Sequence, residues 1–126
     1  MTIKILILVI GISTWTVDGL SQTAIDNSKL STEKELNFSE TDKRGIKAGD
    51  GIIYLIEKDR QTLTAYDKIE IKWTVNIIKA CGEPEVGKPE VRYIKLTEDK
   101  IEITFGKHDF ASVDIKDGKV KYLGAD

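Results

Sequence analysis

Cysteine and histidine each occur once in the 126 residues, as Cys81 and His108. A single cysteine excludes an internal disulfide, so a fold must depend on its hydrophobic core. The same scarcity excludes a zinc site of the usual His/Cys kind. A Cys81–His108 nucleophile–base pair is the weakest of the functional hypotheses, because the two residues lie far apart in the sequence. Cys81 is more simply a buried small side chain, with a reactive thiol or a bond between chains as alternatives.

Arginine is also scarce, with only Arg44, Arg60 and Arg92 among 19 basic residues. The formal net charge is −2 and both signs are interspersed along the chain. Such a balance creates no positive field for a phosphate backbone or an anionic membrane. We therefore expect no nucleic-acid partner.

Long hydrophobic runs are absent: the longest, Ile5–Ile12, has eight residues, whereas a membrane-spanning helix needs about 20. Lys4 precedes this run and Gly19-Leu20-Ser21 follows it. This layout is typical of a secretory signal peptide, here 1–21, with cleavage near Ser21. A buried first strand or a membrane anchor are the alternatives. We predict an exported chain, periplasmic or secreted, without a stable membrane span after cleavage.

Apolar residues are few between Gln22 and Asp50, where Phe38 is the only aromatic. This composition predicts a polar, flexible leader over 22–50. Thr32 and Glu35 have the spacing of a capping box, so a short docked helix is the alternative. The β-domain is then expected to cover 51–126.

From Gly51 onward the hydrophobic period is two, which is typical of half-buried strands. The clearest strand is Glu70–Ile77, whose expected inner face is Ile69, Ile71, Trp73, Val75 and Ile77. The other expected strands centre on Ile52–Ile56, Leu63–Ala65, Val91–Leu96, Ile101–Phe105, Ala111–Ile115 and Val120–Tyr122. Asp117-Gly118 suits a type I′ hairpin turn. The prediction is an all-β fold, an antiparallel meander of about seven strands, arranged as two blade-like units, a curled sheet or a small sandwich.

The β-domain contains an internal repeat. At an offset of 47, Ala65-Tyr66-Asp67 aligns with Ser112-Val113-Asp114, Leu63 with Phe110, and Tyr54 and Ile56 with Ile101 and Ile103. Two residues are then inserted, and Lys72-Trp73 aligns with Lys121-Tyr122. A repeated β-unit of this length is typical of propeller blades. The expected units are 51–81 and 91–126.

This repeat resembles that of quinoprotein-like (PQQ-like) β-propellers, in which a Leu-x-Ala-x-Asp strand precedes a glycine-containing turn and a tryptophan strand. The matching residues are Leu63, Ala65, Asp67 and Trp73, then Asp114, Gly118, Lys119 and Tyr122. The resemblance implies a packing role for Trp73. A propeller needs about 4–8 blades, so two units imply neither the quinone cofactor nor the dehydrogenase activity. The non-enzymatic members are scaffolds in envelope protein assembly, which is the role the resemblance favours.

Both prolines of the chain lie between the two units, in the segment 82–90. Proline fixes φ and removes an N–H donor, so this segment is expected to be a stiff, extended connector. It is either a simple linker or a presented binding loop, since rigid loops often carry recognition. The candidate binding residues are Glu83, Pro84, Lys88, Pro89 and Trp73, and Cys81 is the candidate reactive thiol.

No catalytic residue, metal ligand or cofactor site is predicted, because the sequence lacks a phosphate-binding glycine loop, a serine elbow and a calcium loop. The favoured function is a small exported non-enzymatic module that binds an envelope or secreted protein, or a second copy of itself. The alternatives are a small-ligand carrier and a Cys81-dependent enzyme. A carrier would line its pocket with the aromatic residues Tyr54, Trp73, Tyr93, Phe105 and Tyr122, which are otherwise expected in the core.

Overall fold

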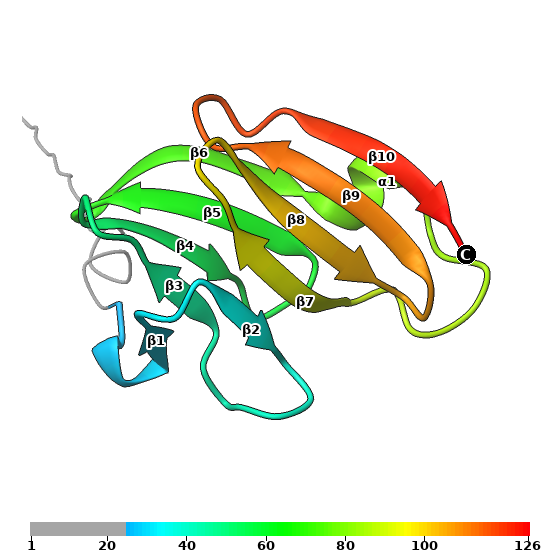
Figure 1. The fold of residues 1–126 in the computed structure, drawn as a ribbon, viewed down its shortest axis with the longest axis horizontal. Helices are drawn as coiled ribbons and strands as arrows, with labels where there is room; N and C mark the ends of the chain where they lie inside the picture. The colour runs from blue at the N-terminus through cyan, green and yellow to red at the C-terminus, as the bar shows by residue number, and fades with distance from the viewer. Residues whose placement is uncertain (1–24) are drawn as a thin grey trace, which may run out of the picture.

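The computed structural model describes residues 25–126, which form two five-stranded sheets and one short helix (Figure 1). The all-β class is confirmed. The predicted signal peptide, 1–21, lies outside the described residues. The strands are β1 (Leu30–Ser31), β2 (Glu35–Asn37), β3 (Gly45–Lys47), β4 (Ile52–Ile56), β5 (Thr62–Asp67), β6 (Glu70–Asn76), β7 (Val91–Leu96), β8 (Lys100–Phe105), β9 (Asp109–Asp114) and β10 (Val120–Ala125). The helix α1 is Ile77–Cys81, and a 3-10 helix covers Asn27–Lys29.

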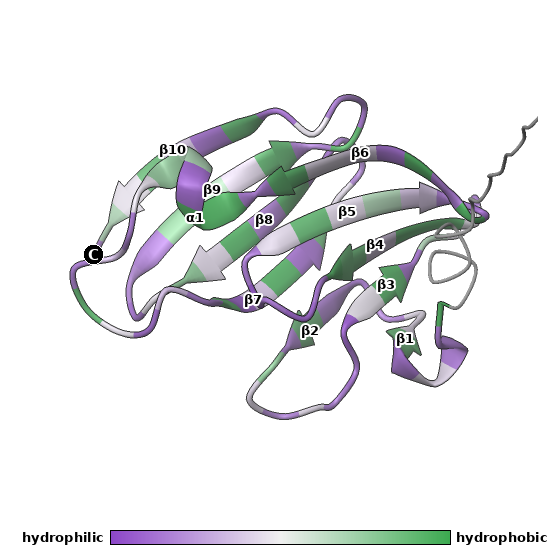
Figure 2. Ribbon diagram, turned by 180° about the vertical axis from the view of Figure 1, so that it is seen from behind, coloured by the Kyte–Doolittle hydropathy of each residue, from purple (hydrophilic) through white to green (hydrophobic). Residues whose placement is uncertain are grey.

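Sheet A has the strand order β1-β3-β4-β5-β6 and sheet B the order β10-β9-β8-β7-β2. After β1 the chain therefore crosses from sheet A to sheet B, where β2 pairs with β7. It then returns to sheet A, where β3 pairs with β1 in parallel. All other pairs are antiparallel. The edge strands β6 and β10 lie on the same side of the molecule, with α1 beside β10 in both Figures 1 and 2.

The buried side chains of both sheets join in one hydrophobic core. Its largest fully buried members are Phe105 of sheet B and isoleucines of both sheets. Figure 2 shows hydrophobic colour along most of β4, whose sequence IIYLI is interrupted only by Tyr54, and hydrophilic colour in most connecting loops. A single core that joins both sheets is the arrangement expected of a β-sandwich.

The seven strands expected after Gly51 are all present, as β4 to β10. The prediction of a flexible leader over 22–50 is wrong for its described part, because β1, β2 and β3 lie within it. Leu36 in β2 and Ile46 in β3 are buried in the core, where they pair with Ile94 and Tyr54. Each of these strands buries few side chains, so no period-two pattern is long enough to detect.

The helix α1 was not expected, because its five residues are too few for a helical period. Asn76 caps it: the side-chain Oδ1 accepts a hydrogen bond from the amide of Lys79 at 2.9 Å. Gly82 ends it with a φ of 97°, in the region that favours glycine. Ile77 and Ile78 are buried, so α1 closes the core beside β5 and β6.

The expected inner face of β6 is only partly formed. Trp73 pairs with Ala65 and is buried, but the register shifts before the next pair, Tyr66 with Ile71. This bulge reverses the alternation, because Tyr66 faces away from Ala65 across the sheet. Ile71 is therefore 46% exposed instead of buried, whereas Ile69 is 50% exposed because it lies in the β5–β6 turn, before the strand begins.

The strand pairing gives the two expected units a different alignment from the one predicted. The pairs Tyr54–Ala65 and Ile56–Leu63 correspond to Ile101–Val113 and Ile103–Ala111. Tyr54 and Ile56 therefore match Ile101 and Ile103 as expected, whereas Leu63 and Ala65 match Ala111 and Val113. The aligned Phe110 and Ser112 lie one residue away, on the other face of β9.

The same pairing corrects the expected match of Trp73 with Tyr122. Trp73 pairs with Ala65, and Val120 pairs with the equivalent residue Val113. Trp73 thus corresponds to Val120. Tyr122 pairs with Ala111 one step further along β10 and is 46% exposed.

Candidate functional site

The loop Gly82–Glu90 connects α1 to β7, and its backbone is fastened to the turn between β8 and β9. The amide of Lys107 donates to the carbonyl of Val86 at 2.9 Å. The amide of Gly106 donates to the carbonyl of Glu90 at 3.0 Å. These bonds hold the middle and the end of the loop against one edge of the sandwich.

A second set of hydrogen bonds ties the loop to the turn between β4 and β5. The side-chain amide of Gln61 donates to the carbonyl of Pro89 at 3.1 Å. The amide of Val91 donates to the carbonyl of Arg60 at 2.8 Å. The loop is therefore held by turns of both sheets, which matches the stiff connector expected from its prolines.

Two glycines allow the loop to approach the β8–β9 turn this closely. A Cβ on Gly106 would lie 2.4 Å from the Cβ of Pro84. A Cβ on Gly87 would lie 2.6 Å from the amide nitrogen of Lys107. Both glycines also have positive φ, of 60° and 92°. Any larger residue at either position would push the loop away from the turn.

The outer side of the loop presents an apolar side chain among charges. Val86 is 52% exposed although its carbonyl is hydrogen-bonded. Of the predicted binding residues, Glu83 and Lys88 are exposed, and Pro84 and Pro89 are half-buried. Glu85 is exposed as well. This rigid, mixed surface is suited to contact with another macromolecule.

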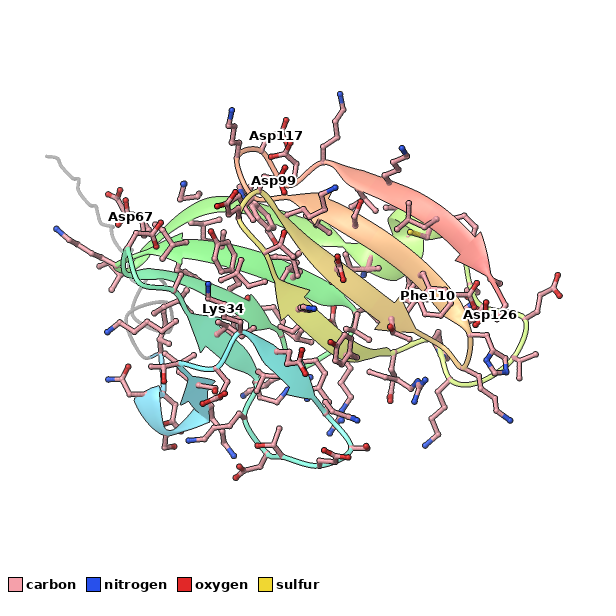
Figure 3. All side chains as sticks on the ribbon, in the orientation of Figure 1. Lys34, Asp67, Asp99, Phe110, Asp117 and Asp126 are labelled. Atoms are coloured by element: carbon pink, nitrogen blue, oxygen red, sulfur yellow. The ribbon has the colours of Figure 1, made fainter. Side chains whose placement is uncertain are left out.

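Trp73, the remaining predicted binding residue, lies at the opposite end of β9 from this loop. It is 8% exposed, and its Nε1 donates to the carbonyl of Ile115 in the turn after β9. Figure 3 shows Asp99 and Asp117 together at that end, and Phe110 and Asp126 at the other. Trp73 is thus a core residue of the described chain and has no exposed face for a partner.

Cys81, the candidate reactive thiol, is half-buried against the core at the end of α1. Burial, and then the nearby Asp109 carboxylate, raise the pKa of the thiol above its usual value. Asp109 is itself buried and accepts a hydrogen bond from the hydroxyl of Tyr122 at 2.7 Å. That hydrogen bond raises the pKa of Tyr122. A thiol with a raised pKa holds little thiolate at neutral pH.

His108 is exposed in the β8–β9 turn, and within residues 25–126 no hydrogen bond joins it to Cys81. The aromatic residues considered for a carrier pocket are divided. Tyr54, Trp73 and Phe105 are buried in the core, whereas Tyr122 is exposed and Tyr93 is intermediate. They do not line one cavity of the described chain.

A pocket that the sequence did not indicate lies beside β3, β4 and the β4–β5 turn, with a volume of about 730 Å³. Two of the three arginines, Arg44 and Arg60, line it. The third, Arg92, is engaged with the carbonyls of Gly106 and Lys107. The pocket was missed because Arg44 falls in the predicted leader. The one signal in the sequence was the scarcity of arginine, because two of only three arginines line the same pocket.

No protein-family model, curated protein or solved structure matches the chain. The resemblance to the PQQ-like repeat therefore stays a prediction based on its own residues.

Among residues 25–126, no group of three or more His, Cys, Asp or Glu side chains is arranged to hold a metal ion. In the same residues, no helix has the length and apolar content needed to cross a bilayer.

Proposed function

We propose that this chain is a small exported, non-enzymatic β-module that binds another protein through the outer side of the loop Gly82–Glu90. The observation that carries the proposal is the position of Val86. Its side chain is 52% exposed while its own carbonyl is fixed by Lys107. A pre-ordered loop loses little conformational entropy when a partner covers it.

The chemistry of the thiol supports a binding role over a Cys81-dependent enzyme. A nucleophilic cysteine needs a depressed pKa, usually from a nearby cation or a helix N-terminus. Cys81 instead ends α1 and has the Asp109 carboxylate beside it, and its pKa is raised. This environment favours the neutral thiol.

The envelope is the proposed location, on two sequence features. The segment 1–21 has the layout of a signal peptide. The repeat resembles that of PQQ-like propellers, whose non-enzymatic members are scaffolds in envelope protein assembly. An accessory role in the periplasm or outside the cell combines both features, and it requires no cofactor.

Affinity capture from an envelope extract tests the proposal. The bait is the purified chain, expressed from its full-length sequence in a host that has a cell envelope. Val86→Asp places a charge on the proposed surface. Ile69→Asp is the matched control, because Ile69 is 50% exposed at the distant β5–β6 turn. We expect one stoichiometric partner with the wild type and with Ile69→Asp, and none with Val86→Asp.

The solution mass of each variant completes the test. A homo-oligomer that Val86→Asp alone dissociates would identify the partner as a second copy. A monomer that captures nothing, or a partner that Val86→Asp retains, would contradict the proposal.

A further inference from the structure

One of the two arginines that line this pocket has a side-chain atom without a partner. The Nη2 atom of Arg44 is buried, and it is the one buried side-chain nitrogen or oxygen of residues 25–126 that makes no hydrogen bond. A charged donor left unpaired in this way is energetically costly, so native structures rarely keep one without a reason.

The guanidinium of Arg44 is also held in a fixed orientation. Its Cζ lies 4.4 Å from the centroid of the Phe38 ring, in a cation–π contact. The backbone of Arg44 is bonded on both sides: its amide donates to Lys29 and its carbonyl accepts from Ile56. The N–H donors of the planar guanidinium are thereby fixed in orientation, and no carboxylate lies at ion-pair distance from them within residues 25–126.

Positive charge is in excess around this atom. The charged residues of the pocket lining are Lys29, Arg44, Lys58 and Arg60 against Asp26 and Glu57. Burial and the nearby Arg60 lower the pKa of Arg44, and Glu90 opposes them only in part. The two guanidinium groups therefore repel each other.

The acidic groups of the lining are already engaged with other partners. Glu57 accepts a hydrogen bond from the hydroxyl of Tyr66 at 2.8 Å. Asp26 accepts from the amide and hydroxyl of Ser28, at 2.9 and 2.6 Å. Within residues 25–126 the single ion pair joins Lys29 to Asp42. Arg44 and Arg60 consequently lack a carboxylate at ion-pair distance in that part of the chain.

The rest of the lining is apolar. Ile25, Leu55, Ile56 and the ring of Tyr66 form walls next to the charged groups. A site of this composition is complementary to an anionic head on a hydrophobic body.

We propose that this pocket binds a small organic oxyanion, a carboxylate or a phosphate, carried on a short apolar stem. Arg44 is the principal anchor, because its plane is fixed against Phe38 and no carboxylate lies at ion-pair distance from it within residues 25–126. Arg60, on the exposed β4–β5 turn, supplies the second positive charge. Guanidinium groups bind both carboxylates and phosphates through paired N–H donors. This site is separate from the outer side of the loop Gly82–Glu90 and does not depend on the role proposed for that loop.

Titration calorimetry at low ionic strength, with the purified chain expressed from the full-length sequence, tests the site. The probes are hexanoate, hexyl phosphate, inorganic phosphate and the neutral hexanol. We expect saturable 1:1 binding of at least one hexyl anion and none of hexanol. The tighter of the two hexyl anions identifies the head group, and inorganic phosphate shows how much the stem contributes.

Two arginine variants and one control assign the binding. Arg44→Gln and Arg60→Gln should each weaken binding of the preferred anion by at least about tenfold, or about 1.4 kcal/mol. Lys72→Gln removes an exposed charge from β6 and should leave the affinity unchanged. If Arg44→Gln lowers the melting temperature too far, Arg60→Gln decides, because Arg60 is an exposed turn residue. The proposal is overturned if no hexyl anion saturates, if hexanol binds equally well, or if the folded arginine variants bind like the wild type.

Discussion

Trp73 donates a hydrogen bond from its indole Nε1 to the carbonyl oxygen of Ile115, across 2.9 Å. The bond joins an edge strand of sheet A to the β9–β10 turn of sheet B. Gly118 in the same turn lies directly on the indole, and Tyr54 packs near it with ring centroids 6.2 Å apart. The indole therefore closes one end of the sandwich, a packing role of the kind that the repeat pattern implied for this residue.

Gly118→Ala should destabilise the fold through this contact. An added Cβ would lie 2.7 Å from two carbon atoms of the Trp73 ring, at a backbone φ of 76°. Backbone strain and overpacking together predict a loss of about 2–4 kcal/mol in urea denaturation. Gly51→Ala is the matched control, because Gly51 has a φ of 90° and no atom near the added Cβ. Equal losses from both variants would show that the indole contact is not tight.

Leu36→Ala tests whether the residues before Gly51 belong to the fold. Leu36 is 6% exposed in β2, so truncation should lower the free energy of unfolding by about 2–5 kcal/mol. Leu123→Ala, at a leucine 54% exposed on β10, should change it by less than about 0.5 kcal/mol. A flexible leader would instead make Leu36→Ala as mild as its control.

The hydrophobic pattern predicted the strands β4 to β10, from the alternation of apolar and polar residues in most of them and from the continuous apolar run of β4. It missed β1, β2 and β3, because strands of two or three residues offer no alternation to count. It also placed Ile69 and Ile71 on the inner face, because neither the extent of the β5–β6 turn nor a bulge leaves a mark in the hydrophobic pattern. The predicted alignment of the two units followed the shared Asp67 and Asp114 and not the strand pairing.

Turn chemistry was only partly predictable. A type I′ turn at Asp117-Gly118 requires positive φ at both residues, but of these two only Gly118 has it. The actual β9–β10 connection runs from Ile115 to Lys119, and the indole of Trp73 lies against it. That contact comes from a distant strand, so the local sequence could not indicate it.

The loop was recognised as a candidate site from its prolines, whereas the arginine pocket was not. Proline and glycine act locally and can be read along the chain. Arg44, Phe38 and Arg60 come from segments that meet only after β3 has joined sheet A. Their proximity is a consequence of strand pairing and has no signature in sequence spacing.

Tyr66 predicts a loss of stability at high pH. Burial, with the hydrogen bond to Glu57, raises its pKa from 10.0 to about 12. Below pH 10 both folded and unfolded chains keep the phenol proton. Between pH 10 and 12 only the folded chain keeps it, so this contribution to stability falls as pH rises through that window.

Urea denaturation at several pH values measures this effect, with Tyr66→Phe as the comparison. The variant should show a shallower decline in stability between pH 10 and 12 than the wild type. Absorbance titration of the folded wild type should also show a phenol that ionises well above pH 10. Identical pH profiles for the two chains would contradict the assignment.

Cys81 should react slowly with a disulfide reagent such as DTNB in the folded chain. Its pKa is raised by burial and by Asp109, so the thiolate is scarce at pH 8 and the sulfur is partly covered. The same chain in urea should react at the rate of an ordinary exposed thiol. A folded chain that reacts faster than the unfolded one would favour an activated nucleophile and the enzyme hypothesis.

The most direct test of the account is the affinity of a captured partner for three chains: wild type, Val86→Asp and Ile69→Asp. The two variants introduce the same charge at side chains that are 52% and 50% exposed. Burying an unpaired carboxylate in an interface should weaken binding by Val86→Asp at least about tenfold. Binding by Ile69→Asp should equal that of the wild type. Equal affinities for all three chains would show that the partner does not contact the loop Gly82–Glu90, and would contradict the proposed binding role of that loop.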